Sequence, residues 1–230
     1  SVIDTARVYG RGRAEEVIGQ VIDELGARDR VFIATKVGTP SSREQAVEML
    51  EQSLRALGVP RVEAMRAHSV AGAGILFPIL REWKQAGRIK YFGVTTVNER
   101  QYPDIERQIR EENLDVIEID YSVVDRSSAD RVLPLAQDHG VAVMTATPFG
   151  GRAGNVLPRV ANRPLPDFAS EIGASSWAQI CLKYNLSHPA VTVVIPGTTN
   201  PRHIADNLGA GRGPLPDADI RRRIERIFDE

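Results

Sequence analysis

The 230-residue sequence has one cysteine and no surplus of charge. Cys181 has no partner for an internal disulfide and no companions for a zinc cluster, so we expect a small buried hydrophobic side chain. Lysine and arginine number 29 against 30 aspartate and glutamate, which leaves no positive excess for a nucleic-acid backbone or a membrane surface. No apolar run approaches the roughly 20 residues that cross a bilayer, and no charged-then-apolar leader is present. These absences predict a soluble, packed protein that binds neither nucleic acid nor membrane, and no metal site.

Short runs of β-branched residues alternate along the chain with longer segments of helical period. This alternation is typical of parallel β/α units. The expected strands centre near residues 2, 34, 64, 91, 117, 143 and 193. Seven repeats favour a (β/α)8 TIM barrel without its first β/α unit, and no strand is followed by the G-x-G-x-x-G pattern of a doubly wound dinucleotide-binding sheet. The sequence therefore predicts one α/β barrel domain over residues 1–230, with a peripheral helix at 217–228.

Two local patterns predict how the first helices pack and begin. Val17, Val21 and Leu25, together with Ile18 and Ile22, recur at helical spacing before Gly26, so we expect them to form the apolar stripe of the first helix. Ser41 and Glu44 have the spacing of a capping box, which predicts the start of the next helix.

The ends of the chain and its loops give further expectations. The opening run, residues 1–4, is apolar and has no turn residues before it, so it is expected to be the end of a buried strand with an upstream piece missing. Such an opening would leave an edge strand open to pairing. Residues 148–166 are predicted as a Gly/Pro-rich loop, and Asn200-Pro201 predicts the start of a helix. A surface location is expected for His139, His188 and the charged run 221–223.

Four chemically capable side chains fall at or after the ends of three successive expected strands. They are Asp4, Tyr9, Lys36 and His68. In a parallel barrel the carboxyl ends of the strands open into one mouth, so these side chains are expected to converge. Lys36 lies in the apolar run VFIATKV, where an unpaired charge is costly. Asp4, on the adjacent strand, is its natural partner.

The chemical use of such a set is proton donation. A tyrosine hydroxyl, with a reference pKa of about 10, is a weak acid at neutral pH, and a nearby ammonium group stabilises its phenolate. Lys36 would supply that ammonium, and Asp4 would hold it charged and in place. His68 would orient a carbonyl oxygen and support developing negative charge. The set suits reduction of a carbonyl, provided that another group delivers hydride.

Several segments, in order over nearly the whole chain, resemble the aldo-keto reductase superfamily. They include Asp4-Thr5-Ala6-x-x-Tyr9-Gly10, Ile33-Ala34-Thr35-Lys36-Val37, Gly93-Val94-Thr95, Tyr121-Ser122-x-x-Asp125-Arg126 and Val194-Ile195-Pro196-Gly197 with Asp206-Asn207-Leu208-Gly209. The resemblance implies a (β/α)8 barrel that binds NADPH without a Rossmann domain. It also implies a catalytic tetrad of Asp4, Tyr9, Lys36 and His68, in which Tyr9 is the general acid.

The resemblance also places the cofactor. Thr95 and Thr96 stand where the family has a Ser-Asn pair on the nicotinamide carboxamide, and Glu118 stands where a glutamine is usual. Ala146 replaces the aromatic residue on which the nicotinamide ring stacks, with Phe149 as a partial substitute. The remaining cofactor residues that the resemblance implies are Pro148, Gly150, Arg152, Gly197, Thr198, Thr199, Arg202, His203, Asp206 and Asn207. NADPH is the expected cofactor, and NADH stays open.

The sequence thus predicts an NADPH-dependent oxidoreductase that reduces aldehydes or ketones to alcohols. One alternative is a non-catalytic nicotinamide-nucleotide-binding barrel or regulatory subunit, which Ala146 and Glu118 motivate. Another is an aldolase that forms a Schiff base on Lys36. Phrases such as Arg81-Glu82-Trp83-Lys84 resemble a bacterial branch whose members often carry a twin-arginine export signal. A cytoplasmic location is the family default, an exported one follows if such a signal was removed, and the oligomeric state has no signal.

Overall fold

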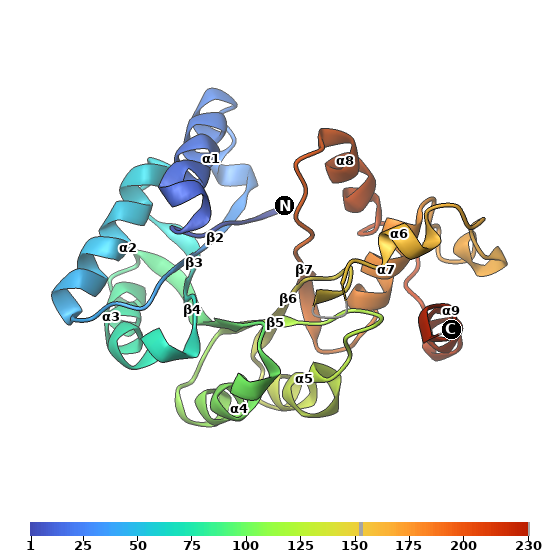
Figure 1. The fold of residues 1–230 in the computed structure, drawn as a ribbon. Helices are drawn as coiled ribbons and strands as arrows, with labels where there is room; N and C mark the ends of the chain where they lie inside the picture. Colours follow the sequence, from blue (N-terminus) through green and yellow to red (C-terminus); the bar gives the residue numbers. More distant parts are fainter. Residues whose placement is uncertain (152–153, 230) are drawn as a thin grey trace. The chain divides into compact units, whose positions relative to one another are not determined.

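The chain folds as an α/β protein with parallel strands in one sheet. The computed structural model describes residues 1–151 and 154–229. Within this part, strands follow one another in the order β1-β2-β3-β4-β5-β6-β7 (Figure 1). Their bounds are β1 (Val2–Asp4), β2 (Phe32–Val37), β3 (Val62–Ala67), β4 (Ile89–Thr96), β5 (Val116–Asp120), β6 (Ala142–Ala146) and β7 (Val191–Val194). Each of the seven expected strands is therefore confirmed.

Helices alternate with these strands along the chain. They are α1 (Arg13–Glu24), α2 (Arg43–Leu57), α3 (Ala73–Gln85), α4 (Tyr102–Glu111), α5 (Ser128–Asp138), α6 (Leu157–Val160), α7 (Trp177–Leu186), α8 (Pro201–Gly209) and α9 (Ala218–Asp229). The predicted loop 148–166 thus contains one short helix, α6. No helix within residues 1–151 and 154–229 is long and apolar enough to cross a membrane.

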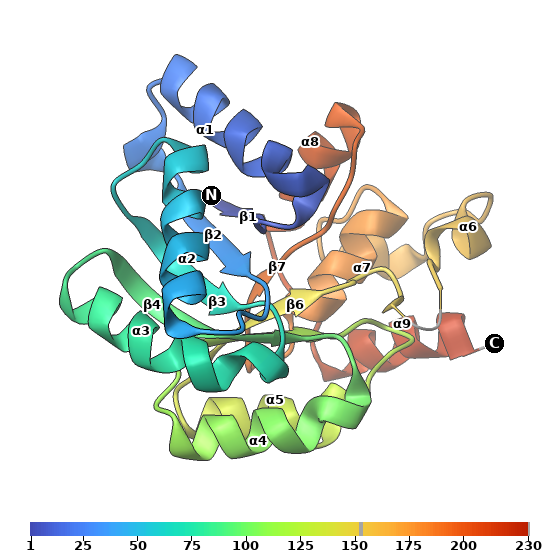
Figure 2. The same cartoon turned by 60° about the vertical axis from the view of Figure 1, so that its left-hand side comes forward.

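Two compact units make up the chain. Unit 1 comprises Ser1–Thr96 and Pro103–Ile117, and unit 2 comprises Val97–Tyr102 and the chain from Glu118 onward. In unit 1 the helices α1, α2 and α3 follow one another along one side of strands β1 to β4 (Figure 2). The expectation of a single domain over residues 1–230 stays a prediction.

The packing of α1 on α2 differs from the expected one. Three residues of the predicted stripe are wrong, because Val17, Val21 and Leu25 are 41%, 44% and 65% exposed, whereas Ile22 is buried as predicted and Ile18 is half-buried. The buried positions include Gly19 and Ile22. A Cβ at Gly19 would lie 2.5 Å from the backbone oxygen of Leu57 at the end of α2. Helical spacing alone allows either face, and the close approach that only a glycine permits selects this one.

The capping box of α2 lies one residue later than predicted. The N-cap is Ser42, whose Oγ accepts a hydrogen bond from the backbone N–H of Gln45 at 3.2 Å. The Gln45 Oε1 in turn accepts from the backbone N–H of Ser41 at 2.6 Å. Ser41 and Glu44 are therefore not the pair that caps this helix, although the helix begins where the pattern indicated.

In unit 2 two residues that were expected at the surface, Arg221 and His188, are half-buried. Arg221 of α9 donates to the Tyr184 carbonyl oxygen at 2.6 Å and to the Tyr121 hydroxyl at 2.7 Å, and its guanidinium lies 4.1 Å from the centre of the Tyr184 ring. His188 packs edge-on against Tyr121, with ring centres 5.4 Å apart. Burial lowers the pKa of His188 below its ordinary value of 6.5. These contacts bind α9 to α7, so the arginine has a packing role.

Cys181 of α7 is fully buried, as expected. Burial raises the pKa of its thiol to about 12, because the thiolate would lose its hydration. The side chain is therefore an inert part of the unit 2 core.

Candidate active site

Unit 1 brings together the four residues of the expected tetrad at the carboxyl ends of its strands. Asp4 is the last residue of β1, and His68 directly follows β3. In the parallel register Asp4 pairs with Ala34 and Lys36 pairs with Arg66. Side chains alternate along a strand, so Asp4, Lys36 and His68 share one face. The register alone therefore gathers three of the four side chains.

Lys36 and Asp4 form the ion pair that the sequence predicts. The Lys36 Nζ lies 2.6 Å from the Asp4 Oδ2. The lysine is fully buried, whereas the Asp4 side chain is 11% exposed. A cation in such a place needs a partner, because its desolvation costs several kcal/mol. The aspartate supplies that partner and fixes the ammonium at one point.

Tyr9 stands beside this pair with its ring partly open to solvent. It is 42% exposed. The Lys36 Nζ lies 5.4 Å from the centre of the Tyr9 ring, and the His68 ring packs edge-on at 5.8 Å between centres. The phenol thus has an ammonium and an imidazole as neighbours, while its exposure leaves it accessible to a small molecule.

The loop that carries Tyr9 is tied to the end of β2. The backbone N–H of Arg7 donates to the Lys36 carbonyl oxygen at 3.0 Å, and that of Tyr9 donates to Ala6 at 3.0 Å. Gly10 follows with φ of 56°, a left-handed conformation that favours glycine. The chain turns directly after Tyr9, and the left-handed conformation at Gly10 explains why a glycine follows the tyrosine.

A buried carboxylate supports the same loop from α1. Glu15 is fully buried, and its Oε1 accepts from the Thr35 hydroxyl at 2.7 Å. Its Oε2 lies 3.8 Å from the Arg7 guanidinium, which passes over Gly12 where a Cβ would collide with it. Burial raises the pKa of Glu15 above its ordinary value of 4.5. Sequence reasoning did not single out Glu15, although an acidic residue in a first helical turn is a recognisable signal.

Arg66 is a second residue that sequence reasoning missed. It is fully buried in β3, and its guanidinium donates to the Asp4 Oδ1. The argument that singled out Lys36 applies to it unchanged, because a charged side chain inside the buried run Val62–Ala67 must find an opposite charge. The sequence interpretation selected His68 after the strand and did not consider Arg66 within it.

The residues expected around the nicotinamide are divided between the units. Thr95 and Thr96 end β4 in unit 1, and both are buried. Glu118 lies in β5 and Ala146 ends β6, both of them buried in unit 2. The half-buried Phe149 and the buried Pro148 and Gly150 follow β6.

The turn after β6 is backbone packed against backbone. Gly150 has φ of 138°, and a Cβ on it would lie 1.8 Å from the Gly154 carbonyl oxygen. The Pro148 carbonyl oxygen accepts from the Asn185 side chain at 3.5 Å. Arg152, which was expected to contact the pyrophosphate, lies outside the described residues. A glycine turn of this kind can bring backbone N–H groups close to an anion.

The amino end of α8 has the features expected of a phosphate contact. Asn200 is the N-cap and accepts from the Arg202 N–H at 3.0 Å. The His203 ring lies 3.3 Å from both the Thr198 hydroxyl and the Asn200 amide. Arg202 and His203 are exposed, and the helix terminus attracts negative charge. The chemistry of these residues is compatible with a bound phosphate group of a nicotinamide dinucleotide.

The other expected cofactor residues of unit 2 surround this helix end. Gly197 and Thr199 belong to the segment before α8, and a Cβ on Gly197 would meet nothing within 4 Å. Asp206 accepts from the Ser176 hydroxyl at 2.6 Å and from the Gln179 amide at 2.8 Å, so it ties α8 to α7. The half-buried Asn207 follows it.

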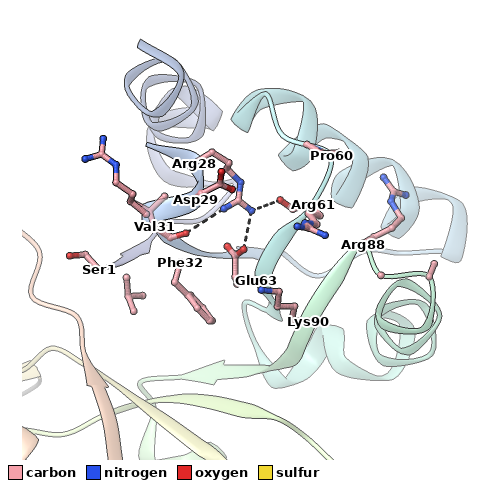
Figure 3. A pocket seen from close by; sticks show the side chains of 14 residues that line it. Ser1, Arg28, Asp29, Val31, Phe32, Pro60, Arg61, Glu63, Arg88 and Lys90 are labelled. Carbon is pink, nitrogen blue, oxygen red and sulfur yellow. Dashed lines mark hydrogen bonds and ion pairs between the residues drawn. The ribbon is translucent and has the colours of Figure 1, made fainter. Parts of the chain in front are cut away.

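A cavity of about 950 Å³ lies at the opposite end of the unit 1 strands (Figure 3). Phe32 begins β2 and Lys90 is the second residue of β4, so both lie at the amino ends of their strands. Arg28 there turns toward Glu63, donating to it at 3.1 Å and to the Arg61 carbonyl oxygen at 2.9 Å (Figure 3). None of the tetrad lines this cavity. It is distinct from the candidate active site.

Parallel β/α units thus place an Asp, a Tyr, a Lys and a His at or after the ends of successive strands. The family model "Aldo/keto reductase family" matches residues 1–227. The chain therefore belongs to the aldo/keto reductase family, and the resemblance seen in the sequence is confirmed.

Curated relatives and solved structures are consistent with this family. The chain is 24% identical to the NADH-specific methylglyoxal reductase of Escherichia coli (strain K12), over 95% of this chain and 81% of the relative. It is 27% identical to a probable voltage-gated potassium channel subunit beta of Arabidopsis thaliana, over 98% of this chain and 82% of the relative.

The fold is shared with an aldo-keto reductase from Klebsiella pneumoniae, solved in complex with NADPH. The TM-score is 0.79 at 23% identity, and the match covers 99% of this chain and 80% of that one. The likeness confirms the expected fold class. The described residues form seven parallel strands, one fewer than the eight strands of a complete (β/α)8 barrel.

Proposed function

We propose that this protein reduces aldehyde or ketone carbonyls to alcohols with a reduced nicotinamide dinucleotide, and that Tyr9 donates the proton. One observation carries the proposal. The Lys36 ammonium, held at 2.6 Å by Asp4, lies 5.4 Å from the centre of an accessible Tyr9 ring that also contacts His68. Membership of the aldo/keto reductase family supports the same reaction class.

Each residue has a distinct part in this mechanism. The Tyr9 hydroxyl donates its proton to the carbonyl oxygen as that oxygen gains negative charge. The Lys36 ammonium stabilises the phenolate left behind, and Asp4 keeps the ammonium charged and stationary. His68 donates a hydrogen bond to the carbonyl oxygen and so orients the substrate. Tyr9 then regains a proton from solvent through its exposed side.

A bound NADPH would supply the hydride that forms the new C–H bond. The family resemblance assigns the nicotinamide to Thr95, Thr96 and Glu118, and the pyrophosphate to Pro148, Gly150 and Arg152. The amino end of α8 would hold the remaining phosphate through Arg202 and His203, whose exposure leaves them open to an anion. The relative solved with NADPH supports this choice, whereas the E. coli relative is named NADH-specific.

The decisive experiment replaces the proton donor. Tyr9→Phe removes the hydroxyl and keeps the ring against Lys36 and His68. We expect NADPH oxidation with a reactive aldehyde to fall about 10²- to 10⁴-fold, the range for general acid catalysis, while quenching of NADPH fluorescence is retained. His139→Gln, at an exposed site in unit 2, is the control. A Tyr9→Phe enzyme with full activity would overturn the assignment.

A second candidate is a nicotinamide-binding barrel without turnover. The small Ala146 in place of a stacking aromatic favours it, as does the relative named a potassium channel subunit beta. NADPH binding without oxidation across a broad panel of carbonyl compounds would establish this function. The aldolase is disfavoured, because a Schiff base requires a neutral amine and Lys36 is held as an ion pair with Asp4.

A further inference from the structure

We propose that Arg66 is a positioning residue of this site, which holds the Asp4 carboxylate so that Lys36 keeps its place beside Tyr9. This inference rests on the proposed function and deepens it. Arg66 acts through Asp4 and does not itself touch the substrate.

The strand register places Arg66 in the site. It is the direct partner of Lys36 in the β2–β3 pair, and it lies two residues before His68, which directly follows β3. It is also fully buried. A guanidinium is always protonated, so its burial is tolerated only where it forms an ion pair with a carboxylate.

Asp4 divides its two carboxylate oxygens between two cations. Lys36 Nζ donates to Oδ2, and the Arg66 guanidinium donates to Oδ1. Because both oxygens are engaged from adjacent strands, the carboxylate cannot rotate without breaking one of the two bonds. Asp4 therefore has one orientation, and the ammonium that it anchors has one position.

The division also changes the electrostatics at Tyr9. A carboxylate that serves only Lys36 would neutralise most of the ammonium's charge. Arg66 adds a second positive charge, so the group of two cations and one carboxylate is positive overall beside Tyr9, whose ring centre lies 5.4 Å from the Lys36 Nζ. Arg66 is thus expected to aid the step in which a phenolate forms and to have little effect on binding of the nucleotide.

The test separates charge from packing. Arg66→Met keeps the length and apolar stem of the side chain, Arg66→Gln keeps a neutral hydrogen-bond donor, and Arg66→Lys keeps the charge. Since a hydrogen bond to a charged group governs the effect, we expect kcat to fall about tenfold to a hundredfold in the first two variants, with KM for NADPH unchanged. Arg66→Lys should recover most of the lost kcat. Steady-state kinetics measure all three, and far-ultraviolet circular dichroism verifies folding.

A double-mutant cycle tests whether Arg66 acts through Asp4. In an Asp4→Asn background the additional Arg66→Met change should lower kcat less than twofold, because the group that it positions is already lost. Arg88→Met is the matched control, since Arg88 is paired with Glu51 and stacked on Trp83 outside the site. This control should retain full kcat.

Two results would overturn the inference. One is an Arg66→Met or Arg66→Gln enzyme with kcat within twofold of the parent. The other is an equal loss of kcat from Arg66→Met in the parent and in the Asp4→Asn background. Tyr9→Phe separates this failure from that of the proposed function: an inactive Tyr9→Phe with a fully active Arg66→Met removes only the role of Arg66.

Discussion

The tetrad in unit 1 and the cofactor residues at α8 in unit 2 differ in how much of their geometry is already formed. Lys36 and Asp4 are joined at 2.6 Å in a buried pair, and Arg66 engages the remaining carboxylate oxygen. At the amino end of α8, Arg202 and His203 are exposed, and the His203 ring lies 3.3 Å from the Thr198 hydroxyl and the Asn200 amide. The tetrad is therefore formed in advance, whereas the proposed phosphate contacts at α8 are open to solvent.

This difference follows from what each region has to do. Groups that stabilise developing charge are effective only when they are oriented before the reaction, so their ordering must come from folding. A phosphate-binding helix end needs only backbone N–H groups and mobile cations, which adjust when the anion arrives. The two regions should therefore respond differently to substitution.

The largest contrast is expected in stability. Lys36→Met removes one of the two cations on Asp4 and leaves the carboxylate paired with Arg66, so the lost charged hydrogen bond should lower the free energy of unfolding by about 1.5–3 kcal/mol. Lys84→Met is the matched control, because its pair with Asp115 at 2.6 Å is 39% exposed on the lysine side. Loss of that pair should cost at most about 1 kcal/mol. Urea unfolding measures both, and equal losses would show that the tetrad is no more preorganised than a surface pair.

A smaller effect is expected at α8. Arg202→Ala should raise the Kd for NADPH about tenfold and leave that for NADH within about twofold, because the guanidinium would meet a phosphate that NADH lacks. Unfolding free energy should be unchanged, since the side chain is exposed. Arg222→Ala on α9, paired with Asp219 at 3.3 Å, is the control. Fluorescence titration with NADPH and with NADH measures both Kd values. An equal change in the two values would show that Arg202 does not contact the 2′-phosphate.

The smallest expected effects concern the dependence of stability on pH, which should have opposite signs for one group in each unit. Glu15 in unit 1 has a raised pKa, so the native state holds this proton more tightly than the unfolded chain, and stability should fall as pH rises from about 4.5. His188 in unit 2 has a lowered pKa, so its contribution should be lost as pH falls below about 6.5.

The matched variants are Glu15→Gln and His188→Gln, each unfolded in urea between pH 4 and 8. Relative to the parent, the first should remove a decline of stability with rising pH, and the second should remove a decline with falling pH. Parallel curves for parent and variant would contradict the corresponding assignment.

The sequence predicted the strand ends and the Lys36–Asp4 pair for a physical reason. A lysine in an apolar strand needs an opposite charge nearby, and Asp4 is the acidic residue on the adjacent strand. The same reasoning was sufficient for Arg66 but was not applied to it. Gly19 shows what periodicity omits, because only the 2.5 Å approach to the Leu57 oxygen decides which face of α1 is buried.

Long-range contacts account for the remaining differences. Arg221 reaches Tyr121, one hundred residues earlier in the chain, and no local pattern indicates that bond. The proposed roles of Thr95, Glu118 and the α8 residues rest on the family resemblance, because no pattern in their own segments indicates a nucleotide.

The single thiol has a practical consequence. Cys181 lies in α7 at the centre of unit 2, and unit 1 contains no cysteine. A small reagent such as iodoacetamide can alkylate this thiol only when local unfolding exposes α7. The alkylation rate therefore measures how often unit 2 opens locally and does not report on unit 1.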